Sequence, residues 1–212
     1  MTPLSILIAD DHAVVRAGLR TLLESRPRWQ VCAEAADGRD AVEKAAKHKP
    51  QIAILDIGMP LLNGVEATRQ IRKSSPSTEI LILTMHESDD LVQQVVEAGA
   101  RGYILKDEAD RVLLDAVQAL SQHKPFFSTR VSEAAVTTDP DSAKSSRSRL
   151  TPREREILQL LAEGKSNKEV ANLLNISVNT AEAHRANIML KLDFHSLAEL
   201  VLYAIRNNII QT

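Results

Sequence analysis

The chain has 212 residues, of which 44% are hydrophobic and 25% charged, and its formal net charge is −2. These ordinary fractions exclude a fibrous or disordered chain and suit one larger and one smaller globular domain. The longest apolar run near the start, residues 4–9, is far too short to cross a bilayer and lacks the flanks of a signal peptide. We therefore expect a cytoplasmic protein with no membrane partner, in which the only cysteine, Cys32, is a small buried side chain.

Short apolar runs alternate with amphipathic helical stretches through the first 125 residues. Strands are predicted at residues 4–9, 29–35, 51–56, 79–84 and 102–105, and helices at residues 13–25, 38–47 and 89–98, after Asn63, and in a stretch ending near His123. Five strand–helix units with short connections predict an α/β fold, a doubly wound five-stranded parallel sheet with helices on both faces.

Polar side chains stand where these predicted strands end. Asp10 and Asp11 follow the first strand, Asp56 ends the third, Thr84 ends the fourth and Lys106 follows the fifth. Because the carboxyl ends of parallel strands share one edge, which is where open α/β sheets place their chemistry, we expect these five side chains to meet.

Three carboxylates at one edge repel one another unless a cation lies between them. Mg²⁺ takes oxygen ligands from few carboxylates, and the backbone carbonyl of Gly58 in the following loop is a further candidate ligand. Lys106 and Thr84 would then face the oxygens of an incoming phosphoryl group. The pattern predicts a site at which Asp56 becomes an aspartyl phosphate.

Each of these residues alone has an ordinary structural interpretation as a turn, a helix cap or a strand end. Their joint placement argues for a site, and it resembles the receiver domain of two-component response regulators, a flavodoxin-like fold. The matching residues are Asp10, Asp11, Asp56, Met59, Pro60, Gly64, Thr84, Gly99, Tyr103 and Lys106.

The resemblance implies that Asp56 is the phosphoacceptor and that Asp10, Asp11 and Asp56 hold Mg²⁺. It implies that Thr84 and Lys106 contact the phosphoryl group, and that Tyr103 is the aromatic switch that moves inward when Thr84 is drawn to the phosphate. A half-buried strand aromatic is the alternative for Tyr103.

Two residues depart from the receiver pattern. Met85 is bulkier than the residue usual after the threonine, and Asp107 stands where many receivers have proline. Both departures bear on rates and loop shape more than on the chemistry.

Residues 126–148 lack a clear period. Polar residues in 137–142 and 145–148 indicate a flexible linker between a domain at 1–125 and a domain at 149–212. Phe126, Phe127 and residues 131–136 are predicted to form one short helix packed on a domain.

Capping signals divide the C-terminal segment into four helices. Thr151 and Ser166 are each followed three residues later by glutamate, as is Ser196, and Ser177 caps a further helix. The predicted helices cover residues 152–163, 167–174, 178–192 and 197–207. A short turn at 175–177 joins the middle two, which predicts a helix-turn-helix whose second helix enters the major groove.

The third of these helices would turn Ala181, Ile188 and Leu192 inward. The C-terminal segment resembles the LuxR-type DNA-binding domain. The resemblance rests on residues 150–154, 164–171, Thr180, 184–185, 187–188 and 191–192. With the receiver attached, the whole chain resembles a NarL/FixJ-family response regulator.

The exposed face of that helix is poor in positive charge, because Glu182, Ala186 and Leu190 replace residues that are often basic or polar in this family. The predicted contacts to double-stranded DNA are Lys165, Lys168, Asn179, Thr180, Glu182, Ala183, His184, Arg185, Asn187 and Lys191. We expect phosphate contacts from the lysines and Arg185, and Glu182 either accepts from a cytosine amino group or faces solvent or Arg185.

The last helix carries two apolar stripes, Leu197, Leu200, Val201 and Ala204 on one side and Ala198, Leu202, Ile205 and Ile209 on the other. One must face the domain's own core; the other is predicted to pair two subunits, as in the family, or to pack on the linker or receiver. The predicted dimer residues are Ala198, Leu202, Ile205 and Ile209.

These features together predict a transcription regulator, not an enzyme. A sensor histidine kinase would phosphorylate Asp56, and a homodimer would then bind DNA. An aspartyl-phosphate hydrolase is the enzymatic alternative, although such enzymes carry a second carboxylate where this chain has Gly58. A regulator that switches through protein partners without phosphate is a third possibility.

Overall fold

A computed structural model describes residues 3–85, 88–127 and 150–210 of the chain. These residues form two compact units, an N-terminal α/β unit and a C-terminal helical unit. The predicted linker residues 128–148, including the helix expected at 131–136, lie outside the described residues.

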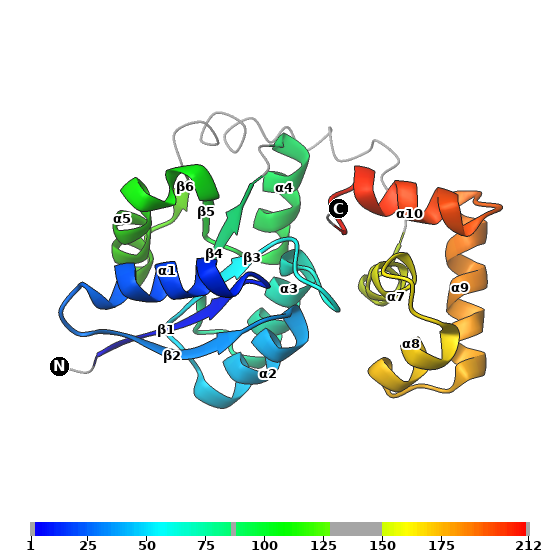
Figure 1. The fold of residues 1–212 in the computed structure, drawn as a ribbon, viewed down its shortest axis with the longest axis horizontal. Helices are drawn as coiled ribbons and strands as arrows, with labels where there is room; N and C mark the ends of the chain where they lie inside the picture. Colours follow the sequence, from blue (N-terminus) through cyan, green and yellow to red (C-terminus); the bar gives the residue numbers. More distant parts are fainter. Residues whose placement is uncertain (1–2, 86–87, 128–149, 211–212) are drawn as a thin grey trace. The chain divides into compact units, whose positions relative to one another are not determined.

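The N-terminal unit is a parallel sheet whose strands lie in the order β2-β1-β3-β4-β5-β6. Helices α1 and α5 contact each other on one face, and α2, α3 and α4 follow one another on the other (Figure 1). The elements are β1 (Leu4–Ala9), α1 (Ala13–Glu24), β2 (Trp29–Ala35), α2 (Gly38–His48), β3 (Ile52–Asp56), α3 (Gly64–Ser74), β4 (Glu79–Thr84), α4 (Asp89–Ala98), β5 (Gly102–Leu105), η1 (Lys106–Glu108), α5 (Ala109–Ser121) and β6 (Phe126–Phe127).

Strands β3, β4 and β5 are covered by helices on both faces, which explains their largely apolar sequences. Every residue of β3, β4 and β5 is buried. The doubly wound α/β fold is confirmed, and its carboxyl edge holds the predicted site residues.

A sixth strand corrects both the predicted strand number and the helix expected at Phe126 and Phe127. His123 adopts a left-handed φ of 58°, which turns the chain after α5. The Phe126 amide then donates to the Arg101 carbonyl at 2.9 Å, and β6 pairs with β5. Edge-strand groups that would otherwise be unpaired are thereby satisfied, and Phe126 packs against the core.

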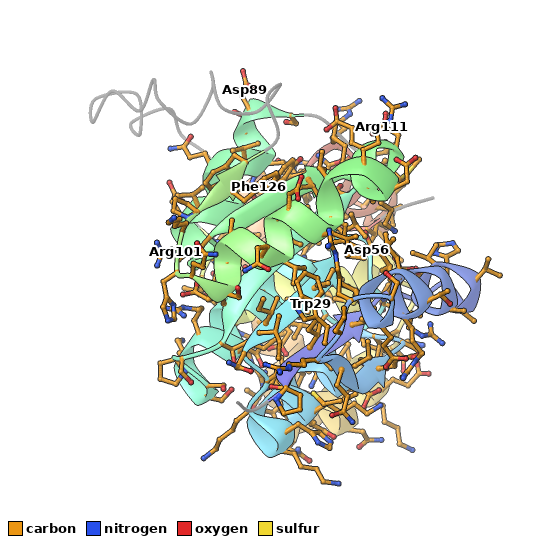
Figure 2. The ribbon with its side chains drawn as sticks, turned by 90° about the vertical axis from the view of Figure 1, so that its left-hand side faces the viewer. Trp29, Asp56, Asp89, Arg101, Arg111 and Phe126 are labelled. Carbon is orange, nitrogen blue, oxygen red and sulfur yellow. The ribbon has the colours of Figure 1, made fainter. Side chains whose placement is uncertain are left out.

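The turn before β6 is held by polar contacts at the opposite end of the sheet from Asp56 (Figure 2). Arg101 donates to the His123 carbonyl at 2.7 Å, and the His123 ring lies 2.7 Å from the buried Glu79 carboxylate. The end of α5 is thus fixed to the starts of β4 and β5.

The C-terminal unit contains α7 (Pro152–Ala162), α8 (Asn167–Leu174), α9 (Val178–Leu192) and α10 (Leu197–Arg206). Its core has residues from all four helices, among them Ile157, Val170, Ile188 and Leu200. Asn175, with a left-handed φ of 51°, makes the turn between α8 and α9. The predicted helix-turn-helix is present.

Capping differs in detail from the prediction at one helix. Thr151 with Glu154 and Ser166 with Glu169 form complete capping boxes. Ser196 accepts from the Glu199 amide, but the Glu199 carboxylate accepts at 2.7 Å from the His195 amide, one residue before the cap.

Candidate functional site

The ends of β1 and β3 and the residue after β5 bring three charged groups together. The Lys106 ammonium nitrogen lies 2.8 Å from Asp10 Oδ2 and 3.1 Å from Asp56 Oδ2. Asp10 and Asp56 are 0% and 2% exposed. Strand register explains the meeting, since Ala9 pairs with Leu55 and Thr84 with Leu105.

Burial disturbs the ionisation of this cluster. It raises the pKa of Asp56, with a further increase from the Asp10 charge, while Lys106 acts in the opposite direction. Burial alone would lower the pKa of Lys106, but Asp10 and Asp56 outweigh it, so the pKa is raised and the ammonium stays charged. The site thus pairs one firmly held cation with an acid whose ionised form is disfavoured.

The remaining oxygens of the two aspartates are fixed by the backbone. Asp10 Oδ1 accepts from the His12 amide at 2.8 Å, and Asp56 Oδ1 accepts from the Ile57 amide at 2.8 Å. Each side chain therefore presents its Oδ2 to the site. These two atoms are buried and, beyond the Lys106 ammonium, have no hydrogen-bond partner among the described residues.

Asp11 lies at the rim of the site and has a neighbour that the sequence did not single out. The His12 Nδ1 atom is 2.6 Å from Asp11 Oδ1, and oxygens or nitrogens of Asp10, Asp11 and His12 all lie within 4.8 Å of one another. His12 directly follows the acidic pair Asp10 and Asp11. It precedes α1, where it makes no side-chain cap.

The loop after β3 is closed by a tight approach of α3. The Gly64 amide donates to the Ile57 carbonyl at 2.9 Å, and Asn63 caps α3 by accepting from the Glu66 amide. A Cβ atom on Gly64 would lie 2.2 Å from the Asp56 carbonyl oxygen. Gly58 lies in this loop between Asp56 and Gly64, directly after Ile57, and is partly buried.

Thr84 and Tyr103 are both fully buried, at 0% exposure. Thr84 ends β4, directly beside the strand that leads to Lys106. Tyr103 pairs with Ile82 on one side and with Phe127 of β6 on the other. Met85, the departure after Thr84, is 65% exposed, and Asp107 is exposed in η1.

The donor set fits a small divalent cation. Two buried carboxylate oxygens with spare lone pairs face one point, and a third carboxylate lies at the rim, all oxygen ligands of the kind that Mg²⁺ prefers. An acidic pocket of this type is general among receiver domains.

On the C-terminal unit, α9 turns Ala181 and Ile188 into the core, as predicted, and Leu192 is partly buried. The opposite face is exposed: Asn179, Thr180, Glu182, Ala183, Ala186, Asn187 and Leu190. His184 and Arg185 are partly exposed at its border. The face therefore carries one negative side chain.

Lys191 is engaged inside the unit, which sequence spacing did not indicate. Its ammonium lies 2.7 Å and 2.8 Å from the two carboxylate oxygens of Glu154, on α7. Lys165, Lys168 and Arg185 make no ion pair with other described residues. Among the predicted DNA contacts, Lys165, Lys168 and Arg185 are therefore the cations available to a partner.

The last helix does not separate into the two predicted stripes. Leu200 and Ala204 are buried as predicted, but Leu197 is 44% exposed, while Ile209 is 7% exposed and belongs to the core. The helix ends at Arg206 and Asn208 has a left-handed φ of 54°, so the chain folds Ile209 back onto Ala204. The exposed apolar face is formed by Ala198, Leu202 and partly buried Ile205.

The fold and site define a class of protein. Residues 6–118 match the response regulator receiver domain, and residues 148–204 match the bacterial regulatory proteins of the luxR family. The chain belongs to the response regulators with a LuxR-type DNA-binding domain, the NarL type, and it is a two-component regulator of transcription. The hydrolase alternative is wrong, because this family consists of transcription factors.

Individual relatives extend over the whole chain. The oxygen regulatory protein NreC of Staphylococcus epidermidis is 40% identical over 217 residues, covering 98% of this chain and 100% of NreC. RcsB of Salmonella enterica serovar Typhimurium, bound to promoter rprA with the phosphomimetic BeF3⁻, is 28% identical with a TM-score of 0.63, over 95% of this chain and 98% of RcsB. A structure of two RcsB dimers on two parallel DNAs is 29% identical with a TM-score of 0.59, over 95% and 98%.

Among the described residues, no helix is both long and apolar enough to cross a membrane.

Proposed function

We propose that a sensor histidine kinase phosphorylates Asp56 and that the modified receiver controls DNA binding by the C-terminal unit. The observation that carries the proposal is the buried meeting of Asp56, Asp10 and Lys106 at the carboxyl edge of the sheet. A kinase and its DNA target both meet the regulator in the cytoplasm, where we place this exchange.

The chemistry follows from the geometry around Asp56. Its Oδ2 attacks the phosphorus of a phosphohistidine, a P–O bond forms, the P–N bond breaks, and the imidazole nitrogen leaves with the electron pair. Lys106, which already contacts this oxygen, would stabilise the negative charge on the phosphoryl oxygens, and the Thr84 hydroxyl would donate to one of them.

Mg²⁺ is the cofactor that the donor set supports. Asp10, Asp11 and Asp56 would hold it, with the Gly58 carbonyl as a further ligand. When bound, it neutralises the carboxylates and the phosphoryl oxygens during transfer. Binding would require Lys106 to shift from Asp10 towards the phosphoryl group.

The signal would leave the site through two neighbouring strands. Thr84 moves to the phosphate, and Tyr103 occupies the space that it frees. Because Tyr103 pairs with Phe127, this movement reaches β6, which occupies the first two residues of the predicted linker. The receiver would therefore extend to Phe127, two residues beyond the boundary predicted from the sequence.

The phosphorylated chain would bind double-stranded DNA as a homodimer. Exposed Asn179, Thr180, Glu182, Ala183 and Asn187 of α9, with His184 at its border, would face the major groove, and Lys165, Lys168 and Arg185 would contact phosphates. Lys191 would contribute less, since Glu154 neutralises it. The face formed by Ala198, Leu202 and Ile205 would join two subunits, and RcsB, which forms dimers on DNA, supports this arrangement.

Labelling with acetyl phosphate or a phosphorylated kinase tests the site. Asp56→Asn is expected to abolish labelling, whereas Asp107→Asn, an exposed carboxylate next to Lys106, is expected to retain it. Labelled Asp56→Asn protein would remove the phosphoacceptor assignment. Beryllofluoride is expected to shift wild-type protein to a dimer; no shift would favour a regulator that works without phosphate.

A further inference from the structure

The exposed face of α9 has the wrong charge for simple attraction to DNA. It presents Glu182 and Ala183 near the start of the helix and Ala186 one turn further on, all exposed. The nearest cation along the helix is Arg185, and the lysine of the last turn is bound to Glu154. Attraction to DNA phosphates therefore comes from residues outside this face, and the face itself is available to contact base edges.

The Glu182 carboxylate is exposed on α9. It makes no ion pair or hydrogen bond with any other residue that the structure describes, and Arg185, three residues further on, makes no ion pair either. Within the described part of the chain, no salt bridge neutralises Glu182. In a groove lined by phosphates, an unpaired carboxylate is repelled unless a base donates a hydrogen bond to it.

The major groove offers few such donors. Guanine and thymine present acceptors, adenine presents its amino group beside the N7 acceptor, and cytosine presents its amino group alone. Resting on the proposed entry of α9 into the major groove, we infer that Glu182 selects cytosine in each half-site and that Ala183 and Ala186 pack against thymine methyl groups next to it.

Helix geometry limits where the thymine lies. Glu182 and Ala186 are four residues apart, or about 6 Å along the axis at about 1.5 Å per residue. Base pairs are stacked about 3.4 Å apart, so the thymine read by Ala186 lies within about two base pairs of the cytosine. The small alanine side chains also let the helix approach the base edges closely.

The first test is selection of bound fragments from a random DNA library by the full-length protein with beryllofluoride. Wild-type protein is expected to select one cytosine per half-site. Glu182→Ala is expected to lower that preference about tenfold, and Glu182→Gln to move it towards adenine, which glutamine contacts through N6 and N7.

Asp193→Asn is the matched control. It removes one negative charge at the end of α9, at a residue whose left-handed φ of 54° asparagine tolerates. This variant is expected to keep the wild-type preference. Wild-type selection of guanine or thymine at the position, or an unchanged preference in Glu182→Ala, would overturn the inference.

A second measurement isolates the methyl contacts without changing the protein. Replacing single thymines in the selected site by deoxyuridine removes only the C5-methyl group, and affinity is expected to fall severalfold at the thymine beside the cytosine. Equal affinity at every position would overturn the alanine contacts. Failure of the wild-type protein to select any sequence would instead contradict the proposed function.

Discussion

Gly64 has almost no room for a larger side chain. Its missing Cβ leaves room for the Asp56 carbonyl oxygen, which would otherwise lie 2.2 Å away, and the neighbouring backbone cannot move without shifting the end of β3. Gly64→Ala is expected to lower the free energy of unfolding of the receiver by about 2 kcal/mol or more. Phosphoryl labelling should fall with it.

Gly18→Ala provides the comparison. Gly18 lies within α1 and a Cβ there meets nothing within 4 Å, so this variant should stabilise the helix by up to about 1 kcal/mol. Urea unfolding of both variants measures the difference, and equal effects of the same sign would contradict the steric explanation.

Asp56 is expected to destabilise the receiver in the absence of a cation. Its pKa is raised by folding, so at neutral pH the ionised carboxylate is less favourable in the folded than in the unfolded chain. Asp56→Asn should therefore raise the receiver's melting temperature in EDTA. Mg²⁺ should then stabilise the wild-type protein more than the variant, and calorimetry with and without Mg²⁺ measures both effects.

Sequence reasoning located the residues whose position depends on strand ends. The sequence predicts that Asp10, Asp56 and Lys106 meet, because each ends or follows a buried strand. The structure confirms this, with the Lys106 ammonium 2.8 Å from Asp10 and 3.1 Å from Asp56. His12 was missed, because its place beside Asp11 is a matter of local loop conformation. The ion pair of Lys191 was missed because Glu154 lies 37 residues away.

At the level of elements, this Lys191–Glu154 pair joins α9 to α7. Burial would raise the pKa of Glu154, but the Lys191 ammonium and the Thr151 donors outweigh it, so the pKa is lowered. The stabilisation is therefore complete above the ordinary glutamate pKa of about 4.3 and is lost as pH falls through the lower folded value.

Lys191→Ala should cost the C-terminal unit about 1 kcal/mol at pH 7, a modest value because the lysine is 37% exposed. The cost should shrink below about pH 4. Amide hydrogen exchange in α7 and α9 measures it, with Lys168→Ala as the control. A pH-independent difference would show that packing of the lysine stem, not its charge, stabilises the helix pair.

Most helix and strand bounds followed from the sequence, because buried strands and capped helices leave strong patterns. The two-residue β6 did not, since two phenylalanines carry no period and their strand exists only because β5 offers an unpaired edge. Ile209 was misassigned for a related reason: its helical phase was extended past Arg206, where the helix ends.

At the level of the whole molecule, DNA affinity is expected to depend on three cations outside the recognition face. Lys168→Ala and Arg185→Ala should each weaken binding uniformly across sequences and reduce the slope of log affinity against log salt by about 1. Fluorescence anisotropy over a salt series measures this. Lys47→Ala changes an exposed lysine of α2 and is the control, which should leave the slope unchanged. A slope that is also unchanged in Lys168→Ala and Arg185→Ala would reject the phosphate contacts.

The strand pairing of Phe126 and Phe127 has a practical consequence for anyone isolating the receiver. A fragment that ends with α5 would lack β6, so the outer edge of β5 would have unpaired amides and carbonyls. An unpaired edge on an apolar sheet is a template for aggregation. Light scattering should show aggregation of a fragment that ends at residue 121, whereas a fragment that extends beyond Phe127 should be monodisperse.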